Sequence, residues 1–240
     1  MTPPWRGQSL FGLRDAPVTG AMPRIFESKE FPECVFPTFL LNGPPVNADL
    51  WGYFQFDTIH YAPFREQFQA LFQPMPQLSP LAEAMRKLRE RDRTIVGLHL
   101  RLLREANHHF YFPTPQSWTL EHLRRLWPKL RNPVLFISTD LEDFSVEPYQ
   151  EFNPITRRDL GLNIQWADFY PDFYALTQCD ALCISNSTFS FVAAMLNQRA
   201  AAFFRPHLFR HAYIPFDPWS SVPLLHRELG TSLAWHRPQA

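Results

Sequence analysis

Small hydroxyl residues stand between a strand-like run and a helix-like run in the C-terminal half of the chain. The apolar run 181–185 is typical of a buried strand, and the polar turn Asn186-Ser187-Thr188 leads into a predicted helix over 188–197. Free backbone N–H groups and the positive end of the dipole attract anions at a helix start. The pattern therefore predicts an anion-binding turn that ends at Phe189, although Asn186 or Ser187 could equally serve as an ordinary helix cap.

A second buried strand, predicted over 94–100, carries His99 and leads into Arg101. The planar guanidinium fork matches the oxygens of a phosphate, and a cation stabilises charge that builds on a departing diphosphate. An arginine together with a helix N-terminus therefore suits a diphosphate. The alternative is a strand-end arginine that pairs with a carboxylate, and His99 could likewise be a structural histidine whose hydrogen bonds are satisfied.

These residues can bind one ligand together only if the strands that carry them end side by side in a sheet. We predict helices over 63–72, 79–92, 117–130 and 188–197, and strands over 94–100, 133–140, 163–166, 181–185 and 200–204. Apolar strands that alternate with helices indicate an α/β fold with a Rossmann-like parallel sheet covered on both faces. Ligands of such sheets bind at the carboxyl ends of the strands, and His99, Arg101, Asp140 and the Asn186 turn all fall there.

The composition narrows the class of protein. The chain has 240 residues, with 23 basic and 23 acidic side chains, so no charge excess points to nucleic acid. Cys34, Cys179 and Cys183 give no disulfide framework. His207 and His211 lack an obvious third ligand, so we expect no metal and no other cofactor. We expect residues 1–49 to be irregular, with one short strand near 35–41.

The N-terminus lacks the pattern of a secretory signal, and no apolar run is long enough to span a bilayer. We therefore expect a cytoplasmic protein, with peripheral attachment to a membrane as the alternative.

Several segments resemble motifs of GDP-fucose-dependent fucosyltransferases, and their order and spacing fit the α-1,2-fucosyltransferase group best. His99-Leu-Arg101 is similar to the His-x-Arg motif of that family, and 186–196 is similar to its Asn-Ser-Thr-Phe motif. The segment 172–179 is similar to the preceding Asp-Phe-x-x-Leu-x-Gln-Cys motif. Two further likenesses, at 50–55 to a Gly-Tyr-Phe-Gln element and at 136–140 to a Phe-Ser-Asp-Asp strand, complete a resemblance that runs from about residue 50 to 206.

The resemblance implies the nucleotide-sugar lobe of a GT-B glycosyltransferase, with an abbreviated N-terminal lobe. Residues 1–92 would form this incomplete acceptor lobe with its linking helices, and 93–240 the nucleotide-sugar-binding domain. The implied reaction transfers fucose from GDP-fucose to a glycan hydroxyl, with inversion and without a metal. The implied partners are the GDP-sugar donor and the glycan acceptor. A membrane surface or a separate partner lobe is a further expected contact.

The same resemblance assigns roles to individual residues. Arg101 would be the catalytic cation on the β-phosphate, and Asp172 would accept the two donors on the Watson–Crick edge of guanine, unless it merely caps its helix. Asp140 would bind a ribose hydroxyl or hold an arginine. The expected substrate-binding residues are His99, Arg104, Asp140, Asp172, Asn186, Ser187, Thr188 and Phe189.

The chain departs from the family motif directly after Arg101. The family commonly has a second arginine where this chain has Leu102, and Arg104 is the nearest cation that could replace it. A nucleotide-sugar-binding domain without turnover is therefore one alternative function. A transferase that uses another nucleotide-sugar donor is a second alternative.

Overall fold

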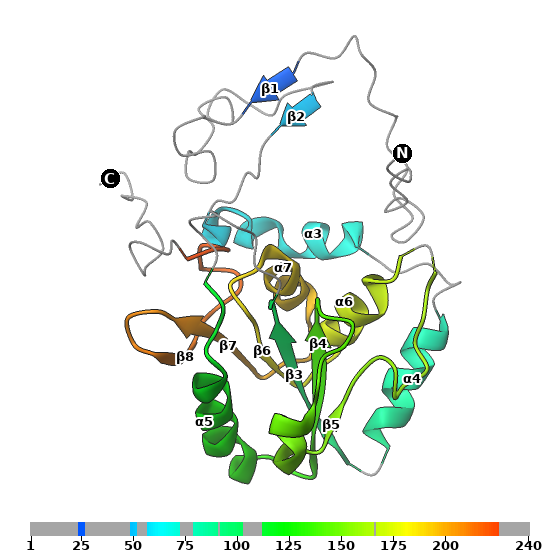
Figure 1. Ribbon diagram of the computed structural model, residues 1–240. Coiled ribbons are helices and arrows are strands. Elements are labelled where there is room, and N and C mark those ends of the chain that lie inside the picture. Colours follow the sequence, from blue (N-terminus) through cyan, green and yellow to red (C-terminus); the bar gives the residue numbers. More distant parts are fainter. Residues whose placement is uncertain are drawn as a thin grey trace.

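A six-stranded sheet forms the centre of the protein in the computed structural model (Figure 1). Five neighbouring strands run parallel, and the last strand at one edge runs antiparallel to its neighbour. The predicted α/β fold with a largely parallel sheet is thus confirmed. The strand order across the sheet is β5 (Pro154–Ile155), β4 (Pro133–Thr139), β3 (Thr94–Leu100), β6 (Ala181–Cys183), β7 (Ala202–His207) and β8 (Ala212–Pro215).

The structure describes residues 57–72, 79–90, 92–102, 112–165 and 167–225, and the backbone of 24–26 and 49–51. The two short N-terminal segments are β1 (Arg24–Phe26) and β2 (Asp49–Trp51), which pair in parallel as a separate small sheet. The strand expected near 35–41 lies outside the described residues.

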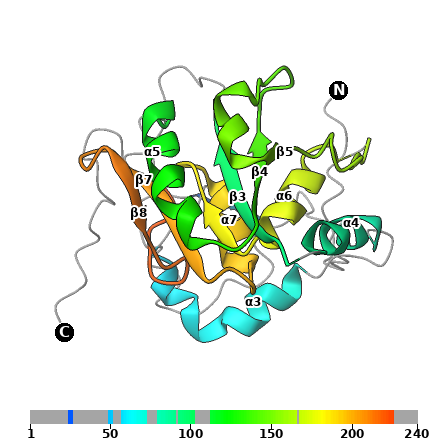
Figure 2. The same ribbon diagram turned by 90° about the horizontal axis from the view of Figure 1, so that it is seen from below.

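Helices cover both faces of the large sheet, as Figure 2 shows from below. One face packs against α4, α6 and α7, and the other packs against α5. Alternate residues of the strands enter the two cores, so that Ile95 faces the first core and Val96 the second. The helices are α3 (Arg65–Leu71), α4 (Ser79–Arg89), α5 (Gln116–Leu126), α6 (Tyr170–Thr177) and α7 (Thr188–Leu196), with 3₁₀ turns at Thr58–His60, Ala62–Phe64, Trp127–Lys129 and Glu147–Phe152.

The predicted strand over 163–166 is wrong for its described residues, 163–165. The chain on either side of them forms turns instead: the Leu162 N–H donates to the Arg157 carbonyl, and the Ala167 N–H donates to the Ile164 carbonyl. The edge position beside β4 is taken by the two-residue strand β5. The antiparallel strand β8 was not expected either.

The N-terminal helices belong to the same core as the sheet. Leu81, Met85 and Leu88 of α4 lie in one buried cluster with Ile95 of β3. This shared core does not by itself mark a boundary between two domains, and the expected boundary at 92/93 stays a prediction. Among the described residues, no helix combines the length and apolar character that crossing a bilayer requires.

Gly97 allows β3 to pack closely against the side chains of Cys179 and Leu182. A Cβ atom at this position would lie 2.7 Å from the Cys179 Sγ and 2.8 Å from a methyl of Leu182. Both neighbours are fully buried, with 0% of their surface exposed, so neither can move without disturbing the core. The strand therefore requires glycine here because there is no room for a side chain.

We expect Gly97→Ala to lower the free energy of unfolding by about 1–3 kcal/mol, the usual cost of overpacking a core. Urea unfolding of the parent, Gly97→Ala, Cys179→Ala and the double variant would measure it. Because Cys179→Ala removes the nearest clashing atom, the double variant should lose less stability than the sum of the two single changes. Strictly additive losses would contradict this account of the packing.

Candidate functional site

A cavity of about 270 Å³ lies at the carboxyl ends of β3 and β4, beside the starts of α6 and α7. We call it the strand-end cavity. Parallel strands converge at this edge, which brings residues far apart in the sequence to one place. Its lining residues are His99, Arg101, Ser138, Thr139, Asp140, Leu141, Glu142, Arg157, Asp168, Phe169, Asp172 and Phe189.

His99 is a buried, neutral histidine at one wall of this cavity. Its Nδ1 lies 2.7 Å from the Ser185 Oγ, and its ring packs on the Phe189 ring with centroids 5.2 Å apart. Burial lowers the pKa of His99 to about 4, more than the nearby carboxylate of Asp140 raises it. The imidazole is therefore uncharged at neutral pH. His99 has the satisfied hydrogen bond of a structural histidine and also faces the cavity.

Arg101 pairs with a carboxylate, as one interpretation of the sequence expected. Its Nε lies 3.3 Å from Oδ2 of Asp140, while the Leu102 N–H donates to Oδ1 of the same carboxylate at 2.7 Å. Asp140 thus holds an arginine, the second of its two predicted roles. About a third of the Arg101 side chain (32%) stays exposed, so the guanidinium remains accessible from the cavity.

Asp172 is a buried carboxylate in the first turn of α6. The N-cap of this helix is Phe169, so the interpretation of Asp172 as an N-cap is wrong. Its Oδ2 lies 3.3 Å from Nη1 of Arg157. Burial nevertheless raises the pKa of Asp172 to about 7, and the attraction of Arg157 only partly opposes this shift. This carboxyl can therefore hold or release a proton near neutral pH.

Arg157 was missed by the sequence analysis, as were Glu142, Asp168 and Phe169. Arg157 follows β5 by two residues and donates to the Asp168 carbonyl as well as pairing with Asp172. It is a second cation within the strand-end cavity. The signal for it is weak, because β5 is too short to stand out in the sequence and the segment after it has no periodic pattern.

The Asn186 turn lies mostly outside the cavity lining, which takes in only Phe189 of the four predicted residues. Both groups of the buried Asn186 amide bind backbone: Nδ2 donates to the Leu225 carbonyl at 2.9 Å, and Oδ1 accepts from the Leu225 N–H at 2.8 Å. Ser187 is the N-cap of α7, without a capping bond from its hydroxyl, and Thr188 is the first helical residue. Ligand binding by Asn186, Ser187 and Thr188 stays a prediction.

Arg104 lies outside the described residues. Within the described part of the chain, no group of three potential metal ligands was found.

Comparison with known proteins found no matching family model and no match among curated proteins. Two of the similar solved structures are fucosyltransferases. The first is the α-1,6-fucosyltransferase NodZ, from a crystal soaked with GDP-fucose, with 14% identity and a TM-score of 0.44 over 64% of this chain and 53% of that chain. The second is a mutant of FUT1 from Arabidopsis thaliana in complex with GDP, with 15% identity and a TM-score of 0.35 over 58% of this chain and 35% of that chain.

The chain thus spans about half the length of the first of these proteins and about a third of the second. At these TM-scores, neither likeness decides the function of the chain or the linkage that it would form.

We expect the stability of the protein to depend on the protonation of Asp172. A raised pKa in the folded state means that this group stabilises the fold fully only below about pH 4, and that the contribution is lost as the pH rises through about 7. Asp172→Asn should therefore gain stability relative to the parent between pH 4 and 8, on the order of a few kcal/mol. Urea unfolding across this pH range would measure it.

The titration of the carboxyl carbon of Asp172 by NMR gives the pKa directly. Arg157→Gln removes the favourable charge beside the carboxylate, so it should move this pKa higher still. A parent pKa near 4, or no difference in pH dependence between the parent and Asp172→Asn, would contradict the prediction.

Proposed function

We propose that the strand-end cavity binds a GDP-sugar and that the protein is a glycosyltransferase that moves fucose from GDP-fucose to a glycan hydroxyl. The observation that carries the proposal is the convergence of motif residues on one cavity. Three motifs of the resemblance contribute to its lining: His99 and Arg101 come from the first, Asp172 from the second and Phe189 from the third, and Asp140 lines it as well. A fold alone would not suggest this function, because one fold serves many activities.

In the proposed complex, the diphosphate lies against the two arginines of the cavity. Arg101 and Arg157 both line it, each beside a carboxylate that orients the guanidinium. Arginine forks bind phosphate oxygens with two hydrogen bonds, which is stronger than a point contact. Arg157 then supplies the second cation that the family motif places at Leu102. Charge that builds on the leaving diphosphate is stabilised by both.

The guanine base would lie against Asp172. An ionised carboxylate accepts two adjacent N–H donors, and among the common bases only guanine presents such a pair on its Watson–Crick edge. Burial raises the pKa of Asp172 and so disfavours its ionised form in the free protein, and the two hydrogen bonds that guanine donates would favour this form on binding. His99, neutral and packed on Phe189, offers a ring nitrogen to the base or the ribose.

The α-1,2 linkage, inversion at the sugar carbon and independence from metals belong to the proposal through the resemblance alone. The acceptor glycan and a general base would come from residues outside the strand-end cavity, or from a partner lobe. A binding domain without turnover is the second candidate. It is favoured by Leu102, which packs against the buried cluster of β3 and β4 where the family has a cation.

The first test of the proposal is GDP binding by Arg101→Ala, measured by isothermal titration calorimetry. Loss of a charged hydrogen bond to the diphosphate should weaken binding by about 1.5–3 kcal/mol. Arg124→Ala is the matched control. Arg124 lies on α5, is exposed, pairs with Glu151 and does not line the cavity. Equal GDP affinity in the parent and in Arg101→Ala would refute the site.

A second test concerns the choice of base. Asp172→Ala should lose most of the preference for GDP over ADP, because the acceptors that match guanine are gone, while binding of the diphosphate persists. Competition of GDP and ADP for a fluorescent nucleotide would measure both affinities. If the variant keeps its preference for GDP, Asp172 is not the residue that selects the base.

Transfer itself needs a separate assay with GDP-fucose. Release of GDP in the presence of a glycan acceptor supports the transferase. Firm GDP binding without turnover, over a broad panel of acceptors, supports the binding domain.

A further inference from the structure

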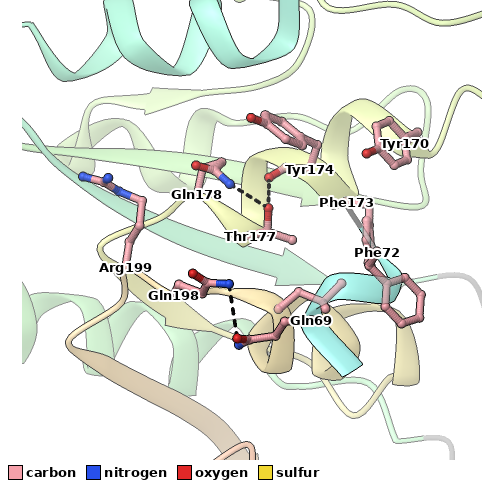
Figure 3. A pocket seen from close by; sticks show the side chains of 10 residues that line it. Gln69, Phe72, Tyr170, Phe173, Tyr174, Thr177, Gln178, Gln198 and Arg199 are labelled. Carbon is pink, nitrogen blue, oxygen red and sulfur yellow. Dashed lines mark hydrogen bonds between the residues drawn. The ribbon is translucent and has the colours of Figure 1, made fainter. Parts of the chain in front are cut away.

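A second cavity, of about 320 Å³, lies between α3, α6 and the chain that follows α7 (Figure 3). We call it the glutamine cavity. It is separate from the strand-end cavity, with which it shares no lining residue. Helix α6 divides the two: Asp172 faces the strand-end cavity, whereas Tyr170, Phe173 and Thr177, spaced one turn apart, face the glutamine cavity.

The lining of this cavity combines aromatic rings with uncharged amides. In Figure 3 the rings of Phe72, Tyr170 and Phe173 gather towards one end, whereas Gln178 and Gln198 lie towards the other. The ring centroids of Tyr170 and Tyr174 are 6.3 Å apart and tilted by 33°. Tyr170 is buried and Tyr174 is half-buried, so Tyr174 is the ring of this pair that reaches the surface of the cavity.

The amides are held in place by hydrogen bonds. Gln69 donates to the Met195 carbonyl at 3.0 Å and accepts from the Gln198 amide at 3.2 Å. On the opposite side, the Gln178 amide donates to the Thr177 hydroxyl at 3.1 Å, and that hydroxyl donates to the Tyr174 carbonyl at 2.7 Å. Each glutamine amide has two donor hydrogens and an acceptor oxygen. Gln178 and Gln198 thus present polar groups whose positions are fixed in advance.

The charges of the described lining residues disfavour an ionic ligand. Among these residues there is no carboxylate to compensate a cation. The one charged group among them is Arg199, which is about half exposed and lies 3.8 Å from Asp180. A single exposed arginine that already faces a carboxylate makes a poor phosphate site. A wholly apolar ligand is disfavoured as well, because it would bury amides without giving them hydrogen bonds.

We propose that the glutamine cavity binds one neutral sugar residue. The weakly positive C–H groups of a sugar ring pack on the electron-rich faces of aromatic rings, and its hydroxyls exchange hydrogen bonds with amides. A volume of about 320 Å³ is at the low end of the range for small-molecule pockets, which suits a monosaccharide or the end of a glycan. This site is independent of the proposed donor site.

The probes are D-galactose, D-glucose and L-fucose, each added separately to the ¹⁵N-labelled full chain. At least one sugar should shift the side-chain amide signals of Gln178 and Gln198 saturably, and its ring protons should receive magnetisation from the aromatic side chains. This measurement needs no substitution, so it does not depend on the folding of a variant. Unmoved amide signals with all three sugars at saturating solubility would overturn the proposal.

Substitutions then locate the site. Gln198→Leu, which keeps the approximate size but removes the amide, should weaken sugar binding by about fivefold, the effect of one neutral hydrogen bond. Gln150→Leu is the matched control, because Gln150 is an exposed glutamine outside both cavities. Arg101→Ala should leave sugar binding unchanged.

Loss of sugar binding in Arg101→Ala would place the sugar in the strand-end cavity and overturn the proposal. So would equal affinity in Gln198→Leu and the parent, or guanosine shifting the Gln178 and Gln198 amides when no sugar does. Failure of GDP binding alone would refute only the proposed donor site, since GDP is not a ligand of the glutamine cavity.

Discussion

The position of β3 between two parallel partners is the constraint on which the rest of the structure depends. Along its whole length β3 pairs with β4, and from Val96 to Leu98 it also pairs with β6. Both faces of the strand are buried, and Gly97 leaves the thiol of Cys179 just enough room above it. A shift of one residue would turn His99 to the opposite face. The location of the strand-end cavity therefore follows from strand register, not from the loops.

The end of helix α6 is joined to the chain that follows α7 by a buried polar side chain. The buried Asn197, just past the end of α7, donates to the carbonyls of Leu176 and Cys179 at the end of α6, and its Oδ1 accepts from the Arg199 and Ala200 N–H groups. One side chain thus satisfies backbone groups at the end of α6 and on the approach to β7. Because residues of α6 line both cavities, the hydrogen bonds that fix the end of this helix help to hold both linings in position.

The sequence predicted the fold where the pattern was long and periodic. The buried runs of β3 and β4 and the helices α4 and α5 were found because continuous apolar strands and amphipathic helices differ clearly in period. The strands β5 and β8 were missed because they have only 2 and 4 residues and each includes proline. The strand predicted over 163–166 is wrong for residues 163–165, because the backbone hydrogen bonds around them close local turns. Hydrophobic periodicity does not reveal such turns.

The site was predictable at strand ends and unpredictable elsewhere. His99, Arg101 and Asp140 follow from the rule that ligands meet the carboxyl ends of parallel strands. Arg157 does not, because tertiary packing alone brings it to Asp172. The Asn186 amide binds the backbone of Leu225. The sequence did not reveal this contact because it depends on the distant segment 222–225, and ligand binding by Asn186 stays a prediction.

The two ion pairs of the strand-end cavity determine which bonds would change when the proposed ligand binds. Arg101 and Arg157 each face an aspartate, so in the proposed complex a diphosphate competes with both carboxylates for the guanidinium groups. Asp140 keeps the backbone N–H of Leu102 as a partner when Arg101 turns to the ligand. Burial raises the pKa of Asp172, and without Arg157 its charge would be costly unless new donors arrive. Guanine supplies two such donors. In the proposed complex, binding of the phosphates and binding of the base are therefore coupled: the diphosphate binds Arg157, and the guanine base donates to Asp172.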